Sequence, residues 1–273
     1  MAPERSLQDS RDLEADLELA ISLATGAGEL ALGHFRSSAL EVERKADMSL
    51  VTQADRASEA FIRNALADAR PDDGVIGEEE GAEGADRPWQ WLIDPVDGTH
   101  NFARGVSVWA VLLALVDPSR VPVVGVVVAP ALGASWWAAR GSGAYRNGDA
   151  VAVSSTEALA DAFVSVTPTD AADHRGMAAF RLLVRTAWRV RGFGDFWQHC
   201  LVAEGSLDGC IDVVGVKPYD LAAVRVIVEE AGGRFSDRDG CLTHESGSAM
   251  SSNGRLHQAL LGALSAGDGS DRG

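Results

Sequence analysis

The chain reads Trp91-Leu92-Ile93-Asp94-Pro95-Val96-Asp97-Gly98-Thr99-His100-Asn101-Phe102 in its first half. The three apolar residues at its start predict a buried strand with Asp94 at its end, and Pro95, which has no N–H to donate, is expected to stop the strand's hydrogen bonds. Gly98 and Thr99 can then open a helix whose free N–H groups favour an anion. Asp94 and Asp97 would face one cavity, which suits a divalent metal ion held against a phosphate.

An ordinary turn between two strands, built on Asp-Pro and Asp-Gly, would explain about half of these residues. It does not explain them all together. A motif with seven fixed positions would occur by chance in a chain of this length with a probability on the order of one in a million. The seven positions are Asp94, Pro95, Asp97, Gly98, Thr99, Asn101 and Phe102.

The composition favours a folded protein that acts on a small molecule. The chain has 273 residues, of which 46% are hydrophobic, and this is enough for a full core. Its 24 Lys and Arg stand against 40 Asp and Glu, and the net charge of -16 opposes binding to nucleic acid or to an anionic membrane. If the substrate carries phosphate, the negative charge of the protein would repel it. Metal ions held by acidic residues must then make the local electrostatic potential positive.

Cysteine usage and hydropathy predict a cytoplasmic protein. Three cysteines without C-x-x-C spacing suggest neither a disulfide framework nor a zinc site. The N-terminal residues do not resemble an export signal. The most apolar region, residues 106–130, is broken at Asp117-Pro118-Ser119-Arg120, so each half is too short to span a bilayer and a buried β-hairpin is expected.

Periodicity and turn residues predict two lobes of mixed helix and strand. Helices are expected over 13–35, 54–69, 180–188, 196–204 and 221–231, and strands over 75–77, 135–139, at Val190 and over 211–216. Residues 42–52 are expected to be extended, and the segment after Glu80 to be an exposed loop. We expect an N-terminal α+β lobe (1–150), a C-terminal α/β lobe (151–265) and a disordered tail (266–273).

Two further segments place acids after an apolar run or before a helix. Gly77-Glu78-Glu79 follows a short strand, and alone it is more typical of a solvated loop. Lys217-Pro218-Tyr219-Asp220 precedes a predicted helix, and alone it is more typical of a helix cap. Together with Asp94 and Asp97, however, these acids supply the separated oxygen ligands that Mg²⁺ requires.

From about Lys45 to Gly233 the chain resembles the inositol monophosphatase superfamily of magnesium-dependent, lithium-sensitive phosphomonoesterases. The resemblance implies a layered α-β-α-β-α sandwich of the inositol monophosphatase and fructose-1,6-bisphosphatase type, two or three Mg²⁺ ions, and a homodimer. The metal ligands that it implies are Glu78, Asp94, Asp97, Asp220 and the carbonyl of Val96.

The same resemblance implies direct in-line attack by a metal-activated water, without a covalent intermediate. Glu78 and Thr99 would orient and deprotonate the water with help from Asp55, and Gly98 and Thr99 would face the phosphate. Lys45 and Asp47 match a mobile loop. Two residues depart from the family pattern and bear on substrate fit, namely Tyr219, where Trp is usual, and His100, where Lys or Thr is common.

The substrate is expected to be histidinol phosphate. Inositol-cleaving members tend to carry a glutamate where this chain has Val213. Residues 105–110, 188–196 and 200–205 most resemble histidinol-phosphate phosphatases of histidine biosynthesis. Arg191 and Asp195 of these segments are the expected substrate contacts, with Asp195 meeting an amine or imidazole. Alternatively, Asp195 is only a helix N-cap after Gly194.

Other phosphate esters stay open, namely an amino-nucleoside or nucleoside monophosphate, a sugar phosphate, or inositol-1-phosphate. A rival class is a non-catalytic binding or regulatory protein on the same fold, although clustered carboxylates without a metal ion are costly. A nucleotide-binding oxidoreductase is disfavoured, because Gly26-Ala27-Gly28 sits inside a predicted helix with no preceding strand.

Overall fold

The computed structural model describes residues 11–45, 49–167, 174–212 and 215–266. Its helices are α1 (Leu13–His34), α2 (Gln53–Ala69), α3 (Thr99–Ala103), α4 (His174–Thr186), α5 (Asp195–Ala203), α6 (Pro218–Glu230) and α7 (His257–Ser265). Its strands are β1 (Val42–Arg44), β2 (Leu50–Thr52), β3 (Gly74–Gly77), β4 (Gly81–Glu83), β5 (Gln90–Asp97), β6 (Ala110–Val116), β7 (Pro122–Ala129), β8 (Ala134–Ala139), β9 (Ala144–Arg146), β10 (Asp149–Val151), β11 (Phe163–Thr167), β12 (Arg189–Arg191), β13 (Gly209–Asp212), β14 (Arg234–Ser236) and β15 (Ala249–Ser252).

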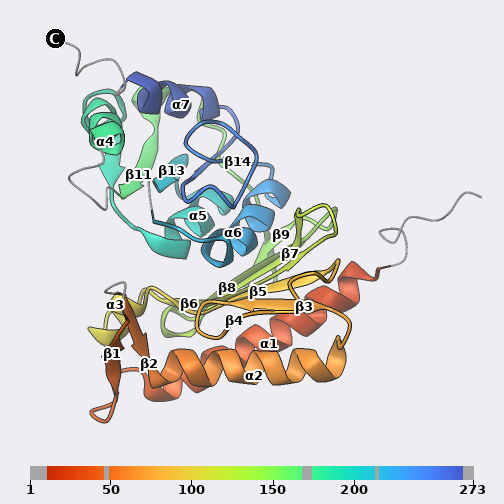
Figure 1. The fold of residues 1–273 in the computed structure, drawn as a ribbon. Coiled ribbons are helices and arrows are strands. Elements are labelled where there is room, and N and C mark those ends of the chain that lie inside the picture. Colours follow the sequence, from red (N-terminus) through yellow and green to blue (C-terminus); the bar gives the residue numbers. More distant parts are fainter. Residues whose placement is uncertain (1–10, 46–48, 168–173, 213–214, 267–273) are drawn as a thin grey trace, which may run out of the picture.

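These elements form five layers (Figure 1). Helices α1 and α2 cover one face of an eight-stranded sheet with the order β10-β9-β8-β7-β6-β5-β3-β4. Helices α5 and α6 lie between this sheet and a five-stranded sheet with the order β12-β11-β13-β15-β14. Helices α4 and α7 cover the outer face of the smaller sheet. The predicted α-β-α-β-α sandwich is therefore confirmed.

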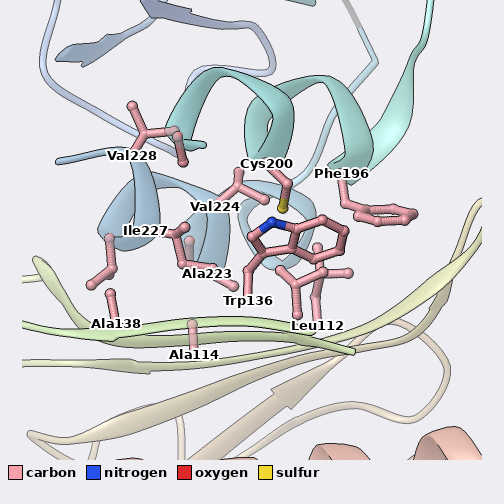
Figure 2. Packing of buried hydrophobic residues seen from close by; sticks show 14 of the residues in the cluster. Leu112, Ala114, Trp136, Ala138, Phe196, Cys200, Ala223, Val224, Ile227 and Val228 are labelled. Atoms are coloured by element: carbon pink, nitrogen blue, oxygen red, sulfur yellow. The ribbon is translucent and has the colours of Figure 1, made fainter. Parts of the chain in front are cut away.

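The centre of the larger sheet is buried on both faces. All seven residues of β6 are buried, and because side chains alternate along a strand, they divide between two cores. Val111, Leu113 and Leu115 pack towards α1 and α2, whereas Leu112 and Ala114 pack towards α5 and α6. Figure 2 shows the second core, where Trp136 lies between the sheet and α5.

A glycine lets α6 approach this sheet closely. A Cβ atom added at Gly125 of β7 would lie 2.3 Å from the carbonyl oxygen of Ala223. No side chain fits in that space, so the backbones of β7 and α6 are in direct contact. This contact fixes the position of the helix whose first turn carries Asp220.

Several predicted elements have different boundaries. Strand β5 does not end at Asp94 but continues to Asp97, and the missing N–H of Pro95 instead coincides with a register shift between Asp94 and Asp97. The strand expected over 211–216 is β13 (Gly209–Asp212); residues 213–214 lie outside the described residues, and residues 215–216 are not in a strand. Residues 81–83, expected as loop, pair with β3 as strand β4.

The predicted hairpin of residues 106–130 is present as the antiparallel pair β6 and β7. No helix in the described part of the chain is long and apolar enough to cross a membrane. The larger sheet ends at Val151 and the smaller begins at Phe163, while the lobe boundary at residue 150 and the disorder of the tail stay predictions. Asp47, Val213 and residues 267–273 lie outside the described residues.

Candidate active site

Four carboxylates from three separate elements come together above the larger sheet. Strand β5 carries Asp94 and Asp97, the turn after β3 carries Glu78, and the first turn of α6 carries Asp220. We call these four residues the carboxylate cluster. Asp94 is only 2% exposed, and its pKa is raised well above the usual range by burial first and then by repulsion from the other three carboxylates. The structure therefore brings together the four acids that the sequence singled out as candidate metal ligands.

Backbone N–H groups orient two members of the cluster. The Phe196 N–H donates to Oδ2 of Asp97 over 2.6 Å, and the Lys217 N–H donates to Oδ2 of Asp220 over 2.7 Å. Burial raises the pKa of Asp97 well above its usual range and that of Asp220 to about 7, although the N–H donors oppose both shifts. Asp220 therefore accepts a capping hydrogen bond at the start of α6 and also lies in the carboxylate cluster, while its role as a metal ligand stays a prediction.

Lysine 45 contacts the fourth member of the cluster. Its Nζ lies 3.1 Å from Oε1 of Glu78 and 2.7 Å from Oε1 of Glu79. Burial raises the pKa of Glu78, whereas the Lys45 ammonium opposes that rise. Within the described ranges, no three His, Cys, Asp or Glu side chains are arranged to hold a metal ion as they stand.

The chemistry of the donors nevertheless fits Mg²⁺. All of the cluster's ligand atoms are carboxylate oxygens, which are the donors that a hard divalent cation prefers. The raised pKa values of Asp94, Asp97 and Asp220 reflect negative charges held together in a poorly solvated place. A divalent cation would relieve that repulsion.

Thr99 and Asp55 lie beside the cluster and contact each other. Thr99 Oγ1 lies 3.0 Å from the Val96 carbonyl oxygen and 3.3 Å from Oδ1 of Asp55, so its proton can be donated to either. Asp55 is fully buried, and its other oxygen accepts from the N–H and the hydroxyl of Thr52 in a capping box at the start of α2.

Gly98 turns the chain from β5 into α3. Its φ of 85° lies in the left-handed region, and an added Cβ would lie 2.9 Å from the Val108 carbonyl oxygen. Only glycine fits both conditions. The turn places Thr99 at the first position of the short helix α3, as the sequence predicted.

A cavity of about 390 Å³ opens next to the cluster. Asp97 and Asp220 line one side of it, and Phe196, Val216 and Leu221 contribute apolar surface. The other lining residues are His100, Thr167, Asp195, His199, Asp212 and Gly215. His100, one of the two departures from the family pattern, therefore lies at this cavity, whereas the other, Tyr219, packs half-buried against the core beneath α5 and α6.

Asp195 is not the N-cap of α5, because Gly194 takes that position. Asp195 has a φ of 49°, an uncommon value for a residue with a side chain, and its Oδ2 accepts from Nδ2 of Asn101 over 3.1 Å. The loss of surrounding water raises its pKa to about 6, with repulsion from Asp212 adding and His100 opposing. Asp195 is thus a carboxylate held at the cavity.

Arg191, the other expected substrate contact, lies elsewhere. It is exposed on β12, and its Nη1 donates to the Val190 carbonyl oxygen over 2.9 Å. It lines a separate surface hollow together with Val184 and Trp188. The structure of a single chain therefore does not bring Arg191 to the cavity.

Sequence reasoning missed a buried pair in the cavity wall, His199 and Asp212. His199 Nε2 lies 2.9 Å from Oδ2 of Asp212, and its Nδ1 lies 2.7 Å from Oγ of Ser251. Burial alone would lower the pKa of His199, but Cys210 and Asp212 outweigh it and raise the pKa to about 10. The pair is therefore a buried histidine hydrogen-bonded to the carboxyl group of Asp212. The only local signal was a lone histidine in an apolar helix.

Comparison with known proteins agrees with this geometry. The model of the inositol monophosphatase family matches residues 12–267. Over 258 residues the chain is 45% identical to a histidinol-phosphatase of Mycobacterium tuberculosis, covering 92% of this chain and 98% of that protein. It is 44% identical to a histidinol-phosphatase of Streptomyces coelicolor, covering 91% and 96% of the two chains.

Among solved structures, the extragenic suppressor protein SuhB of Bartonella henselae matches with a TM-score of 0.85 at 29% identity, covering 92% of this chain and 98% of that one. The chain therefore belongs to the inositol monophosphatase family and is a phosphatase. The resemblance to this family, and within it to histidinol-phosphatases, is confirmed.

Proposed function

We propose that this phosphatase hydrolyses histidinol phosphate to histidinol with the help of Mg²⁺. The observation that carries the proposal is the position of Asp195, a carboxylate at the cavity beside the carboxylate cluster. A phosphate held at the cluster would place its leaving group in this cavity. Asp195 would then meet the positively charged amine of the leaving group.

Mg²⁺, when bound, would supply positive charge to the phosphate oxygens and lower the pKa of the attacking water. Glu78, Asp94, Asp97, Asp220 and the Val96 carbonyl would hold it. We assign Glu78 and Thr99 to orienting the water. Glu78 suits proton acceptance because burial raises its pKa towards neutral pH. Thr99 can donate its own proton to Asp55 and use its oxygen to accept from the water.

The cavity favours an amine over a neutral polyol. Oδ2 of Asp195 accepts from Asn101, and no described residue donates to Oδ1, so Oδ1 is available to the substrate. A charge-assisted hydrogen bond to an ammonium group would satisfy it. A sugar or inositol hydroxyl would leave the carboxylate without a counter-charge. The names of the two histidinol-phosphatases described above support the same choice.

The test is phosphate release by the purified protein with histidinol phosphate, inositol-1-phosphate and nucleoside and amino-nucleoside monophosphates, each with Mg²⁺ and with EDTA. We expect Mg²⁺-dependent release with a kcat/KM that is highest for histidinol phosphate. A higher value for another ester would reassign the substrate and keep the chemistry. No release from any ester would favour the non-catalytic alternative. The homodimer and the cytoplasmic location stay predictions, to be tested by light scattering and cell fractionation.

A further inference from the structure

A buried ion pair on α2 lies directly behind the turn that carries Glu78. Glu59 is 0% exposed, and Arg63, one helical turn later, is 9% exposed. The Nε of Arg63 donates to Oε1 of Glu59 over 2.8 Å. Burying a carboxylate completely is costly unless donors surround it, and replacing a buried ion pair by apolar residues is often neutral for stability. The pair therefore calls for an explanation other than stability.

Both members of the pair contact the backbone of the turn that follows Glu78. Oε2 of Glu59 accepts from the Glu79 N–H over 2.8 Å, and Oε1 accepts from the Glu80 N–H over 3.0 Å. Nη2 of Arg63 donates to the carbonyl oxygen of Gly81 at the end of the turn. The pair thus binds three consecutive residues of backbone immediately after Glu78.

The residue before Glu78 is shaped by the same pair. A Cβ atom added at Gly77 would lie 2.1 Å from Oε1 of Glu59 and 2.8 Å from Nη2 of Arg63. Gly77 does not have a positive φ, so its backbone conformation alone does not require glycine. The required space is taken by the carboxylate of Glu59. The glycine of the Gly-Glu-Glu segment is therefore explained by the ion pair behind it.

We propose that Glu59, held by Arg63, is a positioning residue that fixes the backbone after Glu78 and so directs the Glu78 carboxylate towards Asp94. Glu59 lies one helical turn after Asp55, so α2 presents both buried acids on the same side. The N–H of Glu78 itself donates to the Ile93 carbonyl oxygen of β5 over 3.2 Å. The turn is therefore anchored to the strand that carries Asp94 and to α2.

The proposal rests on the proposed Mg²⁺ dependence and predicts an effect on metal affinity. In Glu59→Gln, one carboxylate oxygen becomes an NH₂ group that faces a donor, so a bond to Glu79, Glu80 or Arg63 is lost. Groups that orient metal ligands typically contribute about 10- to 100-fold to metal affinity. We expect the Mg²⁺ concentration for half-maximal activity to rise by that factor, while KM for the ester at saturating Mg²⁺ changes less than about twofold.

Thermal unfolding gives a readout independent of turnover. The Mg²⁺ concentration that produces half of the metal-induced rise in Tm should increase by the same factor in Glu59→Gln. The matched control is Asp16→Asn, which alters another buried carboxylate on α1, 1% exposed, that is paired with Arg11 and with Arg70. Asp16→Asn should lower the Tm of the metal-free protein but leave the Mg²⁺ midpoint unchanged.

A second variant keeps the test decisive if Glu59→Gln does not fold. Arg63→Lys retains the positive charge near Glu59 but gives up the bond to Gly81, so a smaller shift of the Mg²⁺ midpoint in the same direction is expected. Unchanged midpoints in the folded variants, with a lowered Tm as in the control, would overturn the positioning role. A wild-type protein whose Tm and activity do not respond to Mg²⁺ would instead overturn the proposed function.

Discussion

Replacing Asp195 by Asn tests how the enzyme selects its leaving group. The variant keeps the size of the side chain and an oxygen that can accept from Asn101, but it removes the negative charge. In the wild type, Asn101 donates to Oδ2 and no residue in the described part of the chain donates to Oδ1, so Oδ1 can accept from an amine. The change therefore removes one charge-assisted hydrogen bond, which is worth about 1.5–3 kcal/mol. That energy corresponds to a loss of about 10- to 150-fold in kcat/KM.

The assay compares two esters with each protein. The kcat/KM for histidinol phosphate should fall by the stated factor, whereas the value for inositol-1-phosphate, which has no positive charge, should stay the same or rise slightly. The ratio of the two values cancels any general effect on the carboxylate cluster. An equal loss for both esters would mean that Asp195 acts on the phosphate end, and no loss for either would remove it from the site.

Three further changes test the metal site, the packing and the electrostatics. Asp94→Asn should lower kcat/KM by at least about 100-fold, because one electrostatic catalytic group contributes about 3 kcal/mol to transition-state stabilisation. The Tm of the metal-free protein should not fall. Unchanged turnover would refute the assignment of Asp94 as a metal ligand. Gly125→Ala should lower the free energy of unfolding, measured by urea denaturation, by about 1–3 kcal/mol, because the added methyl group overpacks against Ala223. Gly33→Ala should leave the free energy of unfolding unchanged, because no atom lies within 4 Å of the added Cβ. The pKa of Asp220 is raised from 3.8 to about 7, so the native state binds more protons than the unfolded state between these values. The Tm of the EDTA-treated protein should therefore fall as pH rises from 5 to 8, and Mg²⁺ should restore it; a Tm that rises over this range would contradict the shift.

The local parts of the site were predictable because each lies within one short segment. Asp94 and Asp97 follow an apolar run, Glu78 follows a short strand, and Asp220 begins a helix, so the local setting of each acid could be predicted, although Glu78 and Asp220 taken alone are more typical of a loop and of a helix cap. The amphipathic helices α1 and α2 and the β6–β7 hairpin were likewise visible in the spacing of apolar residues. The local patterns alone could not predict that the separate segments come together in space. That prediction required the family resemblance.

The parts that failed depend on contacts between distant segments. The pair His199 and Asp212 is completed by Ser251, which is 52 residues from His199 in the sequence, so no window of sequence contains it. Asp195 occurs where a helix N-cap is common, and only its backbone φ and its contact with Asn101 decide against that role. Strand β15 was not predicted, because Gly and Ser weaken the local apolar pattern in residues 246–254, and helix α7 (His257–Ser265) was not predicted either.

An acidic protein that binds a phosphate must compensate the negative charges of its own carboxylates. The residues that line the cavity indicate how this chain does so. Of the four aspartates that line it, Asp97 and Asp220 belong to the carboxylate cluster, where a divalent cation would offset them. Asp212 is hydrogen-bonded within the protein to His199. Among the described residues, Asp195 is the remaining lining carboxylate, and the groups that act on it are the Asn101 amide, which donates to it, and His100, which lowers its pKa.

A leaving group with one positive charge matches that arrangement better than a neutral one. It can satisfy the free oxygen of Asp195, whereas a polyol would enter the cavity and leave that charge uncompensated. Discrimination of this kind is strong, because a site built for a polar partner is penalised when the partner is missing. Selectivity for an amine ester would therefore come less from the bond gained with the right substrate than from the unpaired carboxylate left by the wrong one.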